Sequence, residues 1–193
     1  RATGTSAVTL MERHAEMLLQ KMNLPKYVQV QCRIIEVETE VKRRREAFKR
    51  FLDRLLWSEQ GGELTEAVLK ERLKLVNDAL VVQVKRHPFD GFYQEALAQV
   101  YGRSGDPVKA FAAMKQAYYT SPDTPFSLDQ LREAALRVAD MKSAIYFQKQ
   151  IAAAAAPQEL AVESRRLVEM LEETFQMAEA DRVRRRLESR FSQ

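Results

Sequence analysis

Residues that hold metal ions or form disulfides are scarce in this sequence. Among 193 residues there is one cysteine, Cys32, and there are two histidines, His14 and His87. A single cysteine cannot form an intrachain disulfide, and neither histidine has a second ligand at metal-binding spacing. We therefore expect no disulfide, no metal site and no cofactor. A lone thiol also favours a reducing, intracellular compartment.

Glycine and proline are also rare, with six residues of each. Both interrupt helices, whereas the residues that favour helices, such as Ala, Leu, Glu, Lys, Arg and Gln, are abundant. Runs of alternating apolar and polar residues, which would indicate strands, are almost absent. The composition therefore predicts an all-α fold. A hydrophobic content of 46% is enough for the core of one or two small domains.

Long apolar runs are missing as well. None approaches the roughly 20 residues that a transmembrane helix needs, so we expect no membrane span. No signal peptide is visible, and the chain begins with Arg1 instead of methionine, which indicates a processed chain or part of a longer protein. The net charge is +4, with acids and bases mixed along most of the chain, as on a solvated, slightly basic surface.

No catalytic constellation is recognisable. Cys32 has no activating neighbour and is interpreted as a packing thiol. The segment Gly102–Gly105 follows no strand and precedes no Lys-Ser or Lys-Thr pair, so it predicts a turn and not a phosphate loop. The carboxylates alternate with bases, as solvated pairs on helix surfaces do. The sequence therefore predicts a protein that is not an enzyme.

The most informative stretch covers residues 92–122. It predicts two short amphipathic helices joined by a turn at residues 102–107. Asp106 is placed to cap the second helix, and Pro107 fits its first position. Small alanines recur at helical spacing beside larger Tyr and Met side chains, as close antiparallel packing of two helices requires.

This stretch resembles the tetratricopeptide repeat, whose pattern places an aromatic, Leu-Gly, Tyr, Ala, an aromatic and Pro at fixed positions. The corresponding residues here are Gln94, Leu97, Ala98, Tyr101, Ala110, Met114 and Pro122. The spacing agrees, while Gln and Met stand where the family has aromatics. The resemblance implies antiparallel helical hairpins stacked as a right-handed solenoid. It also implies a non-catalytic scaffold that binds another protein.

The repeat spacing continues on both sides of this stretch. Ala144 lies 34 residues after Ala110, and Pro88 lies 34 residues before Pro122. We expect an N-terminal helical region over residues 1–88 and a repeat region over residues 89–193. The predicted repeats cover about 91–124, 125–157 and 158–193. No glycine or proline marks a turn at residues 175–177, so a single helix over 157–191 remains an alternative to the last pair.

The N-terminal region contains an uninterrupted amphipathic stretch, residues 26–57. Its apolar residues step by three and four, and only Arg44 breaks the stripe, which predicts one long helix of about 48 Å. This helix either packs on its sequence neighbours or pairs with a second copy as a coiled coil, giving a homo-oligomer. A turn at residues 58–63 and a helix over 64–86 follow.

Two basic clusters need an interpretation. The first combines Lys42, Arg43, Arg44, Arg45, Lys49 and Arg50 with apolar neighbours. Such a helix binds acidic protein grooves, anionic membranes or nucleic acid, or it packs by its apolar side and leaves its basic side in water. The second cluster lies near the end of the last helix, where the helix dipole favours cations, an interpretation that we prefer to phosphate binding. It consists of Arg182, Arg184, Arg185, Arg186 and Arg190.

The resemblance also implies a partner-binding face, because ligands of this family lie along the first helix of each repeat. The matching positions are Phe92, Glu95, Gln99 and Arg103, then Phe126, Asp129, Glu133 and Arg137. An aromatic with mixed charges suits an extended peptide or a partner helix. The acidic residues argue against the family branch that grips chaperone carboxylates with Lys and Asn. In the alternative, these side chains contact a neighbouring helix of the same chain.

Overall fold

The computed structural model describes residues 2–21, 23–56, 64–121 and 123–191. Within these ranges all regular secondary structure is helical, which confirms the predicted all-α class. The chain divides into two compact units, residues 1–123 and 124–193. None of the described helices combines the length and the apolar character that crossing a membrane would require.

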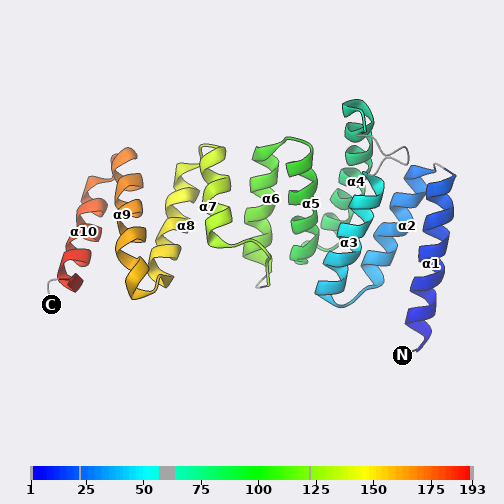
Figure 1. Ribbon diagram of the computed structural model, residues 1–193, viewed down its shortest axis with the longest axis horizontal. Coiled ribbons are helices and arrows are strands. Elements are labelled where there is room, and N and C mark those ends of the chain that lie inside the picture. Colours follow the sequence, from blue (N-terminus) through cyan, green and yellow to red (C-terminus); the bar gives the residue numbers. More distant parts are fainter. Residues whose placement is uncertain (1, 22, 57–63, 122, 192–193) are drawn as a thin grey trace. The chain divides into compact units, whose positions relative to one another are not determined.

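The described part of the first unit forms helices α1 to α6 (Figure 1). Their bounds are α1 Ala2–Gln20, α2 Leu24–Val37, α3 Val41–Leu55, α4 Glu66–Arg86, α5 Gly91–Arg103 and α6 Pro107–Thr120. Helix α1 packs on α2, and α5 packs on α6, while α4 contacts both α2 and α5. Helix α3 lies against α2 and α5. The rings of Tyr27, Phe48 and Phe51 are almost fully buried among these helices.

The division between the units differs from the boundary that the sequence suggested. The sequence suggests a boundary at Pro88, the proline that follows the helix expected over residues 64–86. In the structure, α4 before this proline packs against α5 after it, so the two sides belong to one compact unit. Pro88 follows the end of α4 and lies within the first compact unit.

The predicted long helix over residues 26–57 is wrong. Helix α2 ends at Val37, residues 38–40 are not helical, and α3 begins at Val41. Acidic residues surround the break: the Glu38 carboxylate accepts a hydrogen bond from the Glu40 backbone N–H, at 3.2 Å. Negative charge is unfavourable at the end of α2 and favourable at the start of α3. The break lets α3 fold back, so that Phe51 meets Tyr27 with ring centroids 5.7 Å apart.

The turn expected at residues 58–63, together with Trp57, lies outside the described residues. The helix expected over 64–86 corresponds to α4.

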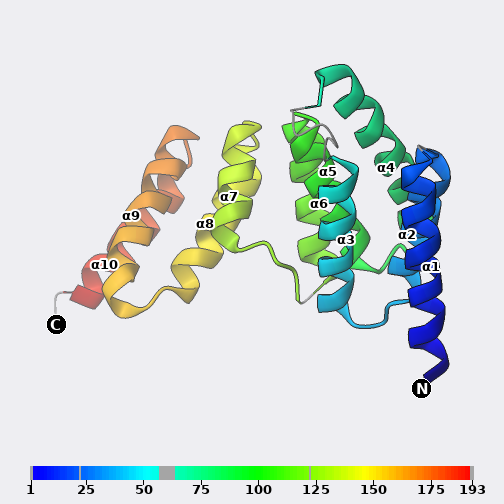
Figure 2. The same cartoon turned by 45° about the vertical axis from the view of Figure 1, so that its right-hand side comes forward.

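The described part of the second unit consists of α7 (Leu128–Arg137), α8 (Met141–Ala154), α9 (Pro157–Glu173) and α10 (Met177–Phe191). Each of these helices packs on the next one along the chain, and Figure 2 shows α9 and α10 side by side. The alternative of a single helix over 157–191 is therefore wrong. The core of the second unit includes the fully buried residues Leu131, Ala144, Phe147 and Leu171.

The turns within the pairs α5/α6, α7/α8 and α9/α10 have the same geometry. Each contains one residue with positive φ, at Gly105 (73°), Ala139 (57°) and Phe175 (59°). The next backbone N–H then donates to a carbonyl five residues earlier. These bonds are Asp106 to Tyr101, Asp140 to Ala135 and Gln176 to Leu171, at 3.0, 2.9 and 2.8 Å. This pattern is the Schellman ending of a helix, which normally carries glycine at the left-handed position. Only the first turn has that glycine.

Candidate functional site

The predicted partner-binding residues on α5 contact α3 of the same unit. Phe92 is only 3% exposed, and its ring meets that of Phe48 edge-on at 6.0 Å. Glu95 is 1% exposed and accepts two hydrogen bonds from Arg45, from Nε and Nη2, both at 2.8 Å. These are contacts of the kind that the same-chain alternative described, so neither side chain is presented at the surface.

The other two predicted residues on α5 lie at the surface. Arg103 is exposed and pairs with Asp53 of α3 at 3.4 Å, and Gln99 is exposed. Helix α3 therefore contacts three of the four predicted positions, by an aromatic pair, a partly buried bidentate ion pair and an exposed ion pair. In this unit a basic amphipathic helix of the chain itself covers the first-helix face.

The basic cluster on α3 is split between the inside and the outside of the unit. Arg44 is 9% exposed, pairs with Asp90 at 2.8 Å, and places its guanidinium carbon 4.4 Å from the centre of the Phe92 ring. The hydrogen bonds to Glu95 raise the pKa of Arg45 above its ordinary value, which keeps this guanidinium charged. Exposed members of the cluster are Lys42, Arg43, Lys49 and Arg50.

The positions of these side chains weaken two alternatives, binding of nucleic acid or an anionic surface and pairing as a coiled coil. Arg44 and Arg45 stabilise the fold by contacts inside the unit, which leaves fewer cations for nucleic acid or an anionic surface. A coiled coil through residues 26–57 required one continuous helix, and the helix is interrupted at 38–40. The apolar side chains Phe48, Phe51 and Leu55 are buried within the unit instead.

The matching face of α7 is open. Asp129, Glu133 and Arg137 are exposed, and Phe126 is half-buried. Both acidic side chains pair with Arg132 of the same helix, at 3.1 Å for Asp129 and 2.8 Å for Glu133.

Arg132 itself is buried and belongs to a polar network that the sequence did not reveal. Its Nη1 donates to Gln148 Oε1 at 2.8 Å, and Gln148 Nε2 donates at 2.9 Å to the backbone carbonyl and the carboxylate of Glu163. Gln148 is fully buried. The network joins α7, α8 and α9, and because a buried polar group is costly when unpaired, it fixes how these helices are aligned.

The cysteine and the histidines have separate structural surroundings, and His87 lies 3.7 Å from the Glu36 carboxylate. Burial and the nearby Glu36 carboxylate raise the pKa of the Cys32 thiol to about 11, so at neutral pH it is protonated. His14 is exposed, and His87 stacks on Tyr93 with ring centroids 5.6 Å apart. Over the described ranges, no group of three or more His, Cys, Asp or Glu side chains is placed to hold a metal ion.

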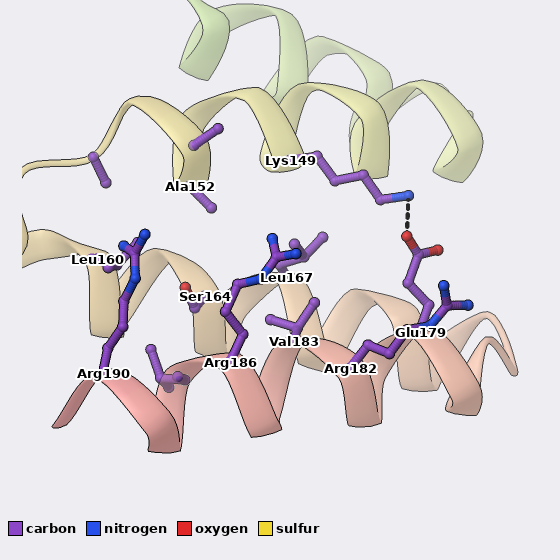
Figure 3. A pocket seen from close by; sticks show the side chains of 13 residues that line it. Lys149, Ala152, Leu160, Ser164, Leu167, Glu179, Arg182, Val183, Arg186 and Arg190 are labelled. Carbon is purple, nitrogen blue, oxygen red and sulfur yellow. Dashed lines mark ion pairs between the residues drawn. The ribbon is translucent and has the colours of Figure 1, made fainter. Parts of the chain in front are cut away.

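A groove that the sequence did not predict lies on the second unit, among α8, α9 and α10 (Figure 3). Its volume is about 520 Å³. The apolar part of its lining includes Ala152 of α8, Leu160 and Leu167 of α9, and Val183 and Leu187 of α10. The cationic part is formed by Lys149, Arg182, Arg186 and Arg190.

The cations along the groove differ in whether a carboxylate of the chain pairs with them. Lys149 pairs with Glu179 at 2.8 Å (Figure 3). Arg184, on another side of α10, pairs with Glu172 and Asp181. Arg182, Arg186 and Arg190 have no carboxylate partner among the described residues. These three arginines are spaced by four residues, so they lie on one helix face. This spacing is the sequence feature that distinguishes them from Arg184 and Arg185.

Comparison of the chain with protein-family models, with curated proteins and with solved structures gave no match.

Proposed function

We propose that this chain is a non-catalytic scaffold of the tetratricopeptide-repeat type that binds another protein. The pairs α5/α6, α7/α8 and α9/α10 are its repeats, arranged as hairpins of a right-handed solenoid. The observation that carries the proposal is the recurring turn: the left-handed residues Gly105, Ala139 and Phe175 are spaced by 34 and 36 residues. A repeated helix–turn–helix unit of this length is the architecture that the sequence pattern of residues 92–122 resembles.

The partner-binding face in this proposal is that of α7. Phe126, Asp129, Glu133 and Arg137 combine one half-buried aromatic with exposed charges of both signs. Helix α3 provides a template for the ligand, because it meets the matching face of α5 with an aromatic ring, with Arg45 paired to Glu95 and with Asp53 paired to Arg103. The partner would present an aromatic or aliphatic anchor beside basic residues, as a peptide or a helix.

The test compares two double variants with equal changes in charge. Phe126→Ala with Arg137→Glu alters the proposed face, while Tyr146→Ala with Lys142→Glu alters exposed positions on α8. A partner is identified by affinity purification with the wild-type chain, and its affinity for each purified variant is then measured by calorimetry. We expect the first variant to weaken binding at least about tenfold and the second by less than about twofold.

Circular dichroism and thermal unfolding serve as the folding control for both variants. Equal affinities for the partner in the two folded variants would reject the α7 face. Conversion of many substrate molecules per molecule of the purified chain would reject the non-catalytic scaffold itself.

A further inference from the structure

The groove among α8, α9 and α10 has the features of a second binding site, distinct from the α7 face. Arg182, Arg186 and Arg190 follow one another at intervals of four residues on α10, which is about 6 Å of helix rise per interval. In Figure 3 the Arg186 and Arg190 side chains extend from α10 along the opening toward α8. A row of cations at this spacing matches carboxylates that repeat every fourth residue on another helix.

The apolar lining adds a second requirement. Leu167 is buried, while Leu160, Val183 and Leu187 are half-exposed within the groove. A phosphate backbone would leave this surface without an apolar partner, whereas leucine-sized side chains would remove it from water. The groove therefore fits a ligand that is both acidic and apolar on one side.

The walls also indicate the conformation of the ligand. They are α-helices, whose backbone N–H and C=O groups are already paired within each helix. An extended peptide would find no backbone partners there, whereas a helix satisfies its own backbone groups. From the charge, the apolar lining and the helical walls, we propose that this groove binds an acidic amphipathic helix of another protein. Its leucine-sized side chains enter the groove, and its carboxylates pair with Arg182, Arg186 and Arg190.

This inference rests on the proposed protein-binding function but not on the α7 face. The probe is a fluorescein-labelled, capped peptide of about 16 residues, with Leu at every third or fourth position and Glu beside them. Two matched peptides accompany it, one with Ser in place of Leu and one with a central proline that breaks the helix. Binding to the full chain is measured by fluorescence anisotropy.

The decisive comparison again uses two variants of equal charge. Arg186→Glu with Arg190→Glu reverses two groove cations, while Arg165→Glu with Arg185→Glu reverses two exposed arginines of α9 and α10 that do not line it. We expect the first to raise the Kd of the leucine peptide about tenfold or more and the second by less than about twofold. Ala152→Phe fills the groove without changing its charge and should weaken binding by a similar factor.

Several outcomes would overturn the proposal, provided that circular dichroism shows the variants folded. These are failure of the wild-type chain to bind the leucine peptide, equal binding of the serine or proline peptide, and equal losses in both charge-reversed variants. Tighter binding of an oligouridylate of the same charge, lost in Arg186→Glu with Arg190→Glu, would assign the groove to nucleic acid. Dimerisation lost in that variant would assign it to a second copy. None of these outcomes alters binding at Phe126 and Arg137, so failure here is distinguishable from failure of the scaffold function.

Discussion

The two units treat corresponding faces of helices α5 and α7 in opposite ways. At a spacing of 34 residues, Phe92, Glu95, Gln99 and Arg103 of α5 match Phe126, which precedes α7, and Asp129, Glu133 and Arg137 of α7. On α5 the aromatic and the first acid are buried under α3, whereas on α7 the acids and the arginine are exposed. The comparison shows that one pattern of residues can form a core or a surface, depending on which helix lies opposite.

The largest expected effect comes from the corresponding aromatics. Phe92→Ala should destabilise the first unit by about 3–5 kcal/mol, because it empties a buried site that contacts Phe48 and Arg44. Phe126→Ala should cost about 1 kcal/mol or less, because its ring is half-exposed. Urea unfolding followed by circular dichroism measures both. Equal losses would mean that the two faces do not differ in burial.

The reactivity of the single thiol, Cys32, tests how well the interior of the first unit is shielded from solvent. Burial raises the pKa of the Cys32 thiol from its ordinary value of 9.0 to about 11. At pH 8 this thiol should therefore react with iodoacetamide about 100-fold more slowly in the folded chain than in urea. The raised pKa also adds stability that is complete below about pH 9 and is lost as pH rises toward 11. Cys32→Ala should reduce this alkaline loss of stability. A native labelling rate close to the rate in urea would show that the thiol is accessible.

The corresponding acids should differ less than the aromatics. Glu95→Gln leaves Arg45 without its bidentate carboxylate partner and should cost about 2 kcal/mol, a value lowered because the Arg45 side chain is 30% exposed. Asp129→Asn removes one of the exposed partners of Arg132 and should cost about 0.5 kcal/mol. Chemical unfolding of both variants, beside the wild type, measures the difference. A larger loss for Asp129→Asn would reverse the assignment of covered and open faces.

The smallest effects are expected at the shared turns. Phe175→Gly and Ala139→Gly should each stabilise the second unit by up to about 1 kcal/mol, since both residues occupy the left-handed region that glycine adopts without strain. Gly105→Ala should destabilise the first unit by about 1 kcal/mol for the same reason. Thermal unfolding detects changes of this size. A loss of stability in Phe175→Gly would show that the turns are not equivalent, because that ring is 87% exposed and packs little.

Local signals in the sequence were sufficient for much of the helical structure. Pro107 and Pro157 begin helices where the sequence placed them, and Asp106 caps α6 by accepting from the Lys109 backbone N–H. The break at residues 38–40 was not predictable from periodicity, because the apolar stripes of α2 and α3 continue the same three-four step. Its energetic cause is the return of α3 onto Tyr27 and α5, a contact between residues far apart in the sequence.

Arg44 illustrates the same limit at the level of single side chains. It was the one residue that interrupted the apolar stripe, and the sequence could not say what a buried guanidinium would meet. The structure supplies a carboxylate, Asp90, and the ring faces of Phe92 and Tyr93. Likewise, the arginines of α10 formed one cluster in the sequence. The four-residue spacing places Arg182, Arg186 and Arg190 on one face of α10, but only the packing of α8 and α9 shows that this face lines a groove.

By itself the sequence determined the all-α class, the two helix pairs that precede Pro157 and most of their ends, because helix propensity, caps and prolines act between near neighbours. Only the tertiary structure decided which of the corresponding faces is covered and which cations share a groove. Those outcomes depend on contacts between helices that are distant along the chain, such as α3 with α5 and α8 with α10. The free energy of such contacts comes from burying surface against a partner, and no local pattern of residues specifies that partner.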